Sequence, residues 1–259
     1  MTSPVHPANL IGRGAAADVY LNQGQAIKLF HPGALEESVL YEADIQQRVY
    51  LAGLSAPRVF GVTTIEGRYA ILMEHVPGPS LGHLMETDRP RAPEYLAKAA
   101  ALQVKMHQTP GAGLPSQSEK LRRRLLHADA LPDEARRRLL SLLDTLAEDR
   151  VVCHGDFHPY NLIQTDHGLA VIDWVDASQG SAGADAARSY LLYLLHGREA
   201  AELYLQYYCQ QAGIKKEAIL QWLPILAGAR LLEAGRGDDT ELLMRLAQGA
   251  LPLDPAKGI

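Results

Sequence analysis

Three polar residues in one short stretch have the types and spacing that phosphoryl-transfer chemistry uses. Residues 153–176 read CHGDFHPYNLIQTDHGLAVIDWVD, which places Asp156, Asn161 and Asp173 among otherwise apolar runs. Carboxylate and amide oxygens suit Mg²⁺, which takes few protein ligands and completes its coordination with phosphate oxygens. A further carboxylate beside such a metal can orient a hydroxyl group and accept its proton. The stretch therefore predicts a site that handles Mg²⁺ and phosphate.

The chain between these residues predicts the fold that would bring them together. From Asn161 to Asp173 it reads as a strand, a tight turn at Asp166-His167-Gly168 and a second strand. A hairpin returns Asp173 toward the residues before Asn161. Asp156, Asn161 and Asp173 are therefore expected to converge.

Lys28 is an independent candidate for phosphate binding in the N-terminal part. It is the only lysine in the first 97 residues and lies in the apolar run AIKLF. A compact ammonium group suits contact with phosphates. Gly12 and Gly14 stand just before a strand-like run, as a flexible loop over phosphates would require, although two glycines alone are a weak signal. A solvent-exposed strand lysine is the alternative interpretation of Lys28.

The elements that must position these residues change in type along the chain. Strand-like runs cover 17–22, 25–31 and 58–76, and helical periodicity covers 33–54, 93–108, 118–128, 132–149 and 183–250. The pattern predicts an α+β protein with a small β-rich N-terminal lobe and a larger helical C-terminal lobe. We place the lobes at 1–76 and 77–259, with the breaker PGPSL as the hinge.

The opening stretch resembles the catalytic loop of the protein-kinase-like superfamily. HGDFHPYN aligns with the protein-kinase pattern H-R-D-L-x-x-x-N. Three features are similar to the aminoglycoside phosphotransferase and choline kinase branch: the Gly in second place, IDW in place of D-F-G, and GSAGADAAR at 180–188. The resemblance covers roughly residues 10–190. It implies a two-lobed protein-kinase-like fold and an ATP- and Mg²⁺-dependent small-molecule kinase. Such an enzyme transfers the γ-phosphoryl group of ATP to an alcohol group.

The resemblance assigns roles to the residues of the loop and the hairpin. Asp156 would be the catalytic base, and Asn161 and Asp173 would be the Mg²⁺ ligands. His154 would brace the loop. His158 stands where protein kinases often carry a lysine that touches the transferred phosphate.

The same resemblance implies a nucleotide site in the N-terminal lobe. Its cofactor-binding residues would be Gly12, Gly14, Lys28, Glu42, Glu74, Val76 and His158. Glu42 would pair with Lys28, in preference to Glu36 and Glu37. Ala17 departs from the pattern, because it stands where the third glycine of G-x-G-x-x-G would be.

The segment ILMEHVPG resembles the adenine-binding hinge of these kinases. The backbone carbonyl near Glu74 and the amide near Val76 would contact the base, with Met73 at the border of the pocket. Because these contacts with the base would use the backbone, GTP is possible as well as ATP. A strand that runs into a Pro-Gly turn is the plainer interpretation.

Two other interpretations of the polar stretch stay open. Asp and Asn also occur in turns, where their side chains hydrogen-bond the nearby backbone. A zinc site built on His154, Asp156 and His158 is conceivable, but no further ligand follows at a recognisable spacing. The agreement over eight residues, with Asp173 at the matching distance, favours the kinase interpretation over both.

The sequence does not identify the acceptor. An acidic segment contains Glu233, Asp238, Asp239 and Glu241, and an acidic pocket would suit a cationic acceptor such as an aminoglycoside. A solvated turn between helices is the alternative for these four residues. The partner is therefore expected to be a small molecule with a hydroxyl group.

Composition argues against several other partners. The chain has 259 residues, a formal net charge of −5 and no strongly basic segment, so nucleic acid and anionic membranes are not expected partners. It has no signal-peptide pattern and no run near the ~20 apolar residues of a spanning helix. Its two cysteines imply no disulfide framework. We expect a cytoplasmic monomer.

Two alternative functions are a protein kinase and a non-catalytic nucleotide-binding module. The HGD and IDW forms argue against a protein kinase, as does the absence of an A-P-E-like segment after Asp173. The joint presence of Lys28, Asp156, Asn161 and Asp173 argues against a pure binder, because binding alone needs no catalytic base.

Overall fold

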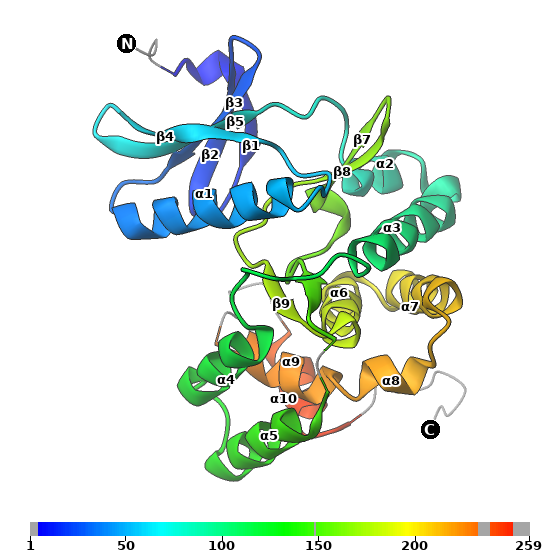
Figure 1. Cartoon of the computed structure of the whole chain (residues 1–259). Helices are drawn as coiled ribbons and strands as arrows, with labels where there is room; N and C mark the ends of the chain where they lie inside the picture. Colours follow the sequence, from blue (N-terminus) through cyan, green and yellow to red (C-terminus); the bar gives the residue numbers. More distant parts are fainter. Residues whose placement is uncertain (1–4, 148, 233–238, 251–259) are drawn as a thin grey trace. The chain divides into compact units, whose positions relative to one another are not determined.

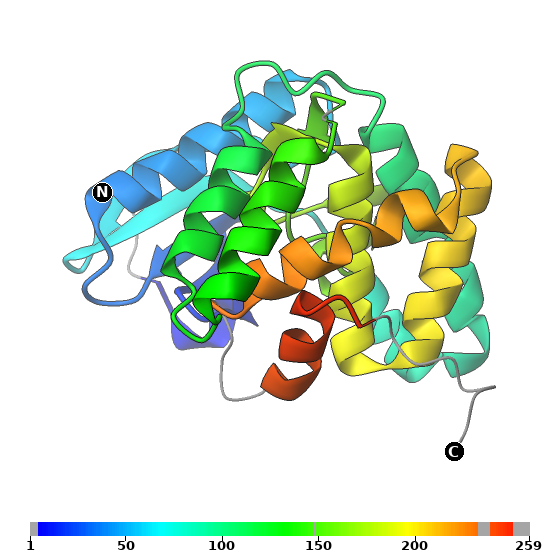
Figure 2. The same ribbon diagram turned by 90° about the horizontal axis from the view of Figure 1, so that it is seen from below.

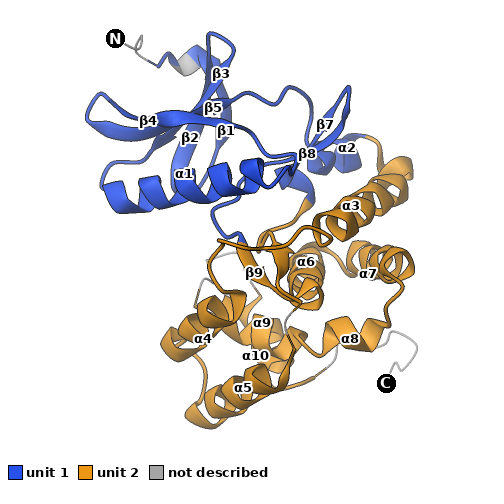
Figure 3. Ribbon diagram, in the orientation of Figure 1, with its two compact units in different colours: residues 1–87, 159–177 blue, residues 88–158, 178–259 orange. Residues whose placement is uncertain are grey.

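A computed structural model describes residues 5–147, 149–232 and 239–250 of the chain (Figure 1, and from below in Figure 2). The chain divides into two compact units, residues 1–87 with 159–177 and residues 88–158 with 178–259 (Figure 3). No helix among the described residues is long and apolar enough to cross a membrane. The predicted fold class, with a β-rich N-terminal part and a helical C-terminal part, is confirmed.

The first unit is built on a five-stranded antiparallel sheet of order β1-β2-β3-β5-β4. Its strands and covering helix are β1 (Leu10–Arg13), β2 (Ala17–Asn22), β3 (Gln25–Phe30), β4 (Val59–Ile65), β5 (Arg68–Glu74) and α1 (Glu36–Leu51), after a short 3₁₀ turn η1 (Pro7–Asn9). Helix α1 runs along one face of the sheet (Figure 1) and buries Val39 and Ala43 against Phe30 and Ile71. The sheet thus has a core on the side that α1 covers.

The predicted elements of this unit are confirmed, with shorter ends. The helix expected over 33–54 begins at Glu36 and ends at Leu51. Gly33 and Gly53, with φ of 93° and 83°, have left-handed backbones outside it. The turn expected at Glu66-Gly67 joins β4 to β5, and both residues have positive φ, as a two-residue hairpin turn requires.

A β-hairpin from the middle of the chain belongs to the first unit. It consists of β7 (Leu162–Thr165) and β8 (Gly168–Val171), and follows the 3₁₀ turn η3 (Pro159–Asn161). The amide of Gln164 donates to the Pro79 carbonyl at 2.9 Å, and the amide of Val171 donates to the Ser55 carbonyl at 2.8 Å. These bonds explain why residues 159–177 group with the N-terminal part. The functional lobes at 1–76 and 77–259 stay a prediction.

The segment before the hairpin packs closely against it. Helix α2 (Leu81–Thr87) lies beside η3, and a Cβ atom on Gly82 would lie 2.5 Å from the Tyr160 ring. A Cβ atom on Gly78 would lie only 2.0 Å from the carbonyl oxygen of Gln164. Glycine is therefore required at position 78 for the backbone to approach the hairpin, and Gly82 leaves room for the Tyr160 ring.

The second unit is helical. Its elements are η2 (Arg89–Arg91), α3 (Ala92–Met106), α4 (Gln117–His127), α5 (Asp133–Thr145), α6 (Ala182–His196), α7 (Arg198–Ala212), α8 (Lys216–Leu220), α9 (Leu223–Arg230) and α10 (Thr240–Ala247), with a small sheet of β6 (Val151–Cys153) and β9 (Ser178–Gly180). Helices α4 and α5 lie side by side in both views (Figures 1 and 2). The run expected over 183–250 is helical but broken, for example at Gly197 and Gly213.

Helix α6 is the central element of this unit. Every side chain from Ala184 to Tyr193 is buried, which includes Asp185 and Arg188. A helix buried on all sides is apolar throughout unless its charges are paired. Asp185 and Arg188 therefore need partners, and each contacts the loop after β6.

Candidate active site

Lys28 projects from β3 and is held by two carboxylates. Its Nζ donates to Glu42 of α1 and, at 3.0 Å, to Oδ1 of Asp173. Burial alone would lower the pKa of Lys28, but the charges of Asp173 and Glu42 outweigh it and raise the pKa above its usual value. The first unit therefore contains a fixed, permanently charged ammonium group.

Glu42 reaches Lys28 from the buried side of α1. It is 6% exposed and lies on the same face as Val39 and Ile45. Burial raises the pKa of the Glu42 carboxyl, and the Lys28 charge opposes that rise. By contrast, Glu36 and Glu37 are exposed in the first turn of the helix, so they do not share the position of Glu42.

The hairpin brings the backbone of Asn161 beside the residue before Asp173. The amide of Ile172 donates to the Asn161 carbonyl at 2.9 Å, continuing the β7–β8 register. Asp173 has φ of 62°, a left-handed conformation that is uncommon outside glycine and is tolerated best by Asn and Asp. Strained backbone of this kind clusters at functional sites.

The donors of Asn161 and Asp173 fit a hard cation. Asn161 is buried, whereas the Asp173 side chain is 41% exposed and keeps one carboxylate oxygen beyond the one that contacts Lys28. Amide and carboxylate oxygens are the ligand types of Mg²⁺. Among the described residues no group of three or more His, Cys, Asp or Glu is arranged to hold a metal ion. The donor set therefore suits a cation that takes few protein ligands.

Of the two glycines proposed to cover the phosphates, only Gly14 lies in the loop between β1 and β2. The Gly14 amide donates to the Ala17 carbonyl at 2.9 Å, and residues 13–16 are exposed. Gly12 lies in β1, opposite Val19. After β5 ends at Glu74, no described residue accepts a hydrogen bond from the backbone amide of Val76. That donor is therefore available to a ligand.

The side chain of Glu74 has a local role. Its Oε2 accepts from the Arg58 amide at 3.2 Å, and its own amide donates to the Arg58 carbonyl at 2.8 Å. Met73 is half-buried, and its sulfur accepts from Gln46 at 3.4 Å. These contacts fix the end of β5.

In the second unit, the loop after β6 is held by one turn of α6. Gly155, with φ of 82°, donates its amide to Asp185 Oδ1 at 2.7 Å. Its carbonyl accepts from Nε of Arg188 at 3.1 Å. Asp185 and Arg188 are three residues apart and share a helix face. Together they fix both backbone groups of the residue before Asp156.

The Asp156 carboxylate faces an arginine and a histidine. Nη2 of Arg188 lies 3.8 Å from Oδ1, and Nε2 of His158 lies 3.3 Å from Oδ2. Burial raises the pKa of Asp156, but His158 and Arg188 outweigh it and lower the pKa to about 2. The Asp156 amide donates to Nδ1 of His154 at 3.1 Å. Asp156 is therefore an oriented carboxylate that stays ionised at neutral pH.

His154 is fully buried and packs edge-on against Phe157, with ring centroids 5.9 Å apart. Since its Nδ1 accepts the Asp156 amide, this nitrogen is engaged in bracing the loop. Because the described residues contain no metal-binding group of this kind, the zinc interpretation of His154, Asp156 and His158 finds no support.

A buried polar network lies behind Asp185 and was not predicted from the sequence. Asp185 Oδ2 accepts from Gln103 at 2.9 Å and lies 3.0 Å from Nε2 of His107. The Tyr208 hydroxyl lies 2.7 Å from Nδ1 of the same histidine. Burial alone would raise the pKa of Asp185, but His107, Gln103 and the Gly155 amide outweigh it and lower the pKa. A charged pair three residues apart in the apolar run of α6 was the available signal for Asp185 and Arg188.

The acidic segment considered for the acceptor is only partly described. Glu233 and Asp238 lie outside the described residues. Asp239 caps α10, where its side chain accepts from the Leu242 amide at 2.8 Å, and Glu241 is exposed in the first turn. The cap gives Asp239 a structural role.

Comparisons with known proteins agree with these features. A family model described as "Phosphotransferase enzyme family" matches residues 8–223. A search of the curated proteins finds no match. Among solved structures, the chain is similar to aminoglycoside phosphotransferase APH(3'')-Id from Streptomyces rimosus in complex with ADP and streptomycin, at 17% identity and a TM-score of 0.60 over 89% of this chain and 94% of that chain.

Two further structures show the same likeness. Choline kinase LicA from Streptococcus pneumoniae is 18% identical, with a TM-score of 0.61 over 96% of this chain and 94% of that chain. A thermostable mutant of aminoglycoside phosphotransferase APH(4)-Ia, in a complex with AMP-PNP and hygromycin B, is 16% identical, with a TM-score of 0.63 over 93% and 91%. At these identities the likeness establishes the two-lobed kinase-like fold.

Proposed function

Because the chain belongs to the phosphotransferase enzyme family, we propose that it is an ATP- and Mg²⁺-dependent small-molecule kinase that phosphorylates an alcohol group. The observation that carries this proposal is the side chain of Lys28, which is held between Glu42 and Asp173. Burying a lysine between two carboxylates has a desolvation cost that can exceed the attraction between the charges, so stability alone does not explain this arrangement. It is well suited to phosphates and a metal ion, which bring charges of both signs.

The nucleotide belongs with residues of the first unit in this proposal. Lys28 contacts the phosphates, the loop with Gly12 and Gly14 covers them, and the carbonyl near Glu74 and the amide of Val76 contact the base. The unengaged amide of Val76 supports the last assignment. Asn161 and Asp173 would hold Mg²⁺, which neutralises charge on the phosphate oxygens when it is bound.

Asp156 acts as the catalytic base. The acceptor oxygen forms its bond to the γ-phosphorus while the bond from that phosphorus to the bridging oxygen of ADP breaks. The hydroxyl proton passes to the Asp156 carboxylate and then to water. A carboxylate with a pKa of about 2 is a weak base, so its main contribution is to orient the hydroxyl in a loose transition state. His158, which contacts Asp156, is assigned to the transferred phosphate.

The remaining expectations belong to the same proposal. The acceptor is a small molecule with a hydroxyl group, and a cationic one such as an aminoglycoside fits the relatives crystallised with streptomycin and hygromycin B. GTP is an alternative donor, because the proposed base contacts use the backbone. We expect a monomer that works in the cytoplasm, with the nucleotide site in 1–76 and the acceptor site in 77–259.

A phosphoryl-transfer assay tests this function. The protein is incubated with γ-³²P-labelled ATP or GTP, with and without Mg²⁺, and with streptomycin, hygromycin B, choline or a protein mixture as acceptor. We expect labelled small-molecule product that requires Mg²⁺. Asp156→Ala should lower turnover by at least about 100-fold while the nucleotide still binds.

The assay also separates the alternatives. Label on proteins alone would indicate a protein kinase. Nucleotide binding without transfer to any acceptor or to water would indicate a non-catalytic module. Full turnover by Asp156→Ala would exclude this residue as the base.

A further inference from the structure

Arg188 is a buried cation to which the catalytic roles above give no part. Its side chain is 7% exposed and lies in the buried stretch of α6 in the second unit. Burying a guanidinium group is costly unless acceptors surround it. Its Nε donates to the Gly155 carbonyl at 3.1 Å, and its Nη2 forms an ion pair with Asp156 Oδ1 at 3.8 Å.

We propose that Arg188 is a positioning residue, which fixes the direction of the Asp156 carboxylate relative to its own loop. This inference rests on the proposed role of Asp156 as the base. The planar guanidinium group presents donors in a fixed fork, so one side chain can hold a backbone carbonyl and the next carboxylate together. A lysine has a single ammonium nitrogen, so it could not present two separate nitrogens to the two groups.

Arg188 and His158, which both face the Asp156 carboxylate, differ in exposure. His158 belongs to the same loop and is 28% exposed, whereas Arg188 is nearly buried on a helix. The histidine is charged only when protonated, but an arginine keeps its charge at every accessible pH. Arg188 therefore keeps its attraction for the Asp156 carboxylate whether or not His158 is protonated.

Other ionisable groups face this loop from the packed elements. Nδ1 of His154 accepts from the Asp156 amide. Asp185, with His107 of α3 behind it, holds the Gly155 amide. These groups fix the backbone, and they do not replace the contact that Arg188 makes to the carboxylate.

The test is the titration of Asp156 itself, which needs no acceptor. Protein labelled with ¹³C at the aspartate carboxyl carbons is titrated by NMR, and Asp156→Asn identifies the resonance. In the wild type we expect the signal to stay that of a carboxylate down to about pH 3, because its pKa is about 2. In Arg188→Met the midpoint should rise by about one pH unit or more, because a neighbouring cation is lost.

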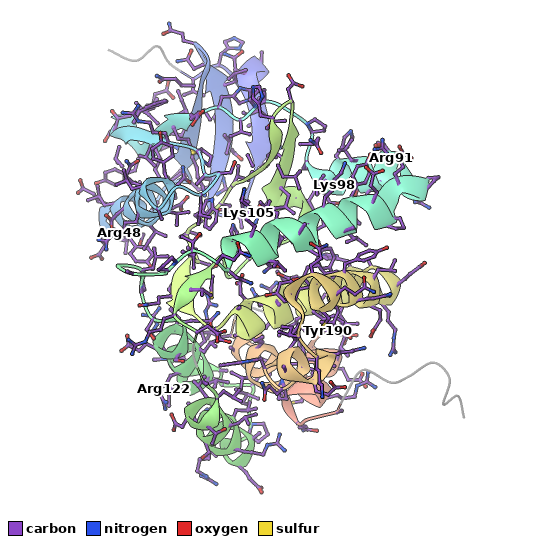
Figure 4. All side chains as sticks on the ribbon, turned by 45° about the vertical axis from the view of Figure 1, so that its right-hand side comes forward. Arg48, Arg91, Lys98, Lys105, Arg122 and Tyr190 are labelled. Atoms are coloured by element: carbon purple, nitrogen blue, oxygen red, sulfur yellow. The ribbon has the colours of Figure 1, made fainter. Side chains whose placement is uncertain are left out.

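Two variants complete the design. Arg188→Lys keeps the charge but loses the forked geometry of the guanidinium group. The titration midpoint of Asp156 should therefore rise less than in Arg188→Met, while the chemical shift of the Asp156 carboxyl carbon changes. Arg122→Met is the matched control, because Arg122 lies on α4 (Figure 4) and pairs with Asp144 instead. It should leave the Asp156 signal unchanged.

An unchanged Asp156 midpoint and chemical shift in folded Arg188→Met would overturn the proposal. If Arg188→Met does not fold, Arg188→Lys decides by the same two readouts. Wild-type protein that transfers no phosphoryl group from Mg·ATP would refute the proposed function, but the titration would still report whether Arg188 holds the carboxylate.

Discussion

At the scale of single residues, the two charged groups proposed for catalysis are held in opposite ways. Lys28 is a cation fixed by two carboxylates, and Asp156 is a carboxylate that faces Arg188 and His158. For both groups the neighbours outweigh the effect of burial on the pKa and favour the charged form. Removing either group therefore changes stability as well as chemistry.

Lys28→Met should destabilise the protein because it leaves Glu42 buried without its cation. We expect the free energy of unfolding to fall by about 1–3 kcal/mol in urea denaturation. The double variant with Glu42→Gln should recover part of that loss, because the buried charge is then gone.

Lys98→Met is the matched control, because Lys98 pairs with Glu94 on the exposed start of α3 (Figure 4). It should change the free energy of unfolding by less than about 0.5 kcal/mol. If the free energy of unfolding falls equally in Lys28→Met and in the double variant, Lys28 does not stabilise the buried charge of Glu42.

Asp156 should make stability depend on acid pH. Its pKa falls from 3.8 to about 2 in the folded state, so its contribution is complete above about pH 4 and is lost as the pH falls toward 2. The expected contribution is about 2 kcal/mol, because one pKa unit corresponds to about 1.4 kcal/mol. Urea denaturation of wild type and Asp156→Asn at pH 4.5, 3.5 and 2.5 measures it.

The wild type should lose more stability than Asp156→Asn over this interval. Parallel pH dependences for the two proteins would contradict a depressed pKa of Asp156.

At the scale of elements, close backbone approaches position the hairpin that carries Asn161 and Asp173. Gly78 lies against the Gln164 carbonyl, and the Pro79 carbonyl accepts from the Gln164 amide. The hairpin is thus joined to the segment after β5 by contacts that leave no room for a side chain. Its position depends on this packing rather than on its two strands alone, because an isolated hairpin is marginally stable.

Gly78→Ala should therefore be strongly destabilising. Its φ of 135° is rarely adopted by other residues, and a Cβ atom would lie 2.0 Å from a backbone oxygen. We expect a loss of about 2 kcal/mol or more in denaturant unfolding.

Gly61→Ala in β4 is the control, because no atom lies within 4 Å of the added Cβ and its φ is not positive. It should stay within about 0.5 kcal/mol of the wild type. Similar losses in the two variants would show that the close approach at Gly78 has no energetic role.

At the scale of the whole molecule, the proposed nucleotide should stabilise the folded chain by mass action. With ATP and Mg²⁺ at about one hundred times Kd, the gain is about 2.7 kcal/mol, which corresponds to a rise in Tm of about 5–10 °C. Differential scanning fluorimetry with ATP or GTP, with and without Mg²⁺, measures this rise.

Asp173→Ala should abolish the part of the shift that requires Mg²⁺, because Asp173 is a proposed ligand of the ion. The absence of any shift with either nucleotide would refute the nucleotide site. A shift that is equal with and without Mg²⁺ would refute the role of Asp173 and Asn161.

The sequence by itself determined the elements and the family. Periodicity located α1 and the strands β2 to β5, because alternating and helical burial leave local patterns. The motif HGDFHPYN indicated the aminoglycoside phosphotransferase and choline kinase branch, and the comparisons confirm that resemblance. Turn residues such as Glu66-Gly67 were predictable for the same reason, since positive φ has a compositional signature.

The tertiary structure supplies the physical reason why distant polar groups meet. The resemblance implied that Glu42 rather than Glu36 or Glu37 pairs with Lys28, and the packing of α1 against the sheet explains it, because it buries the helix face that carries Glu42. Arg188 reaches Asp156 from thirty-two positions further along the chain. Contacts between distant segments depend on how whole elements pack, and that packing leaves no local pattern in the sequence.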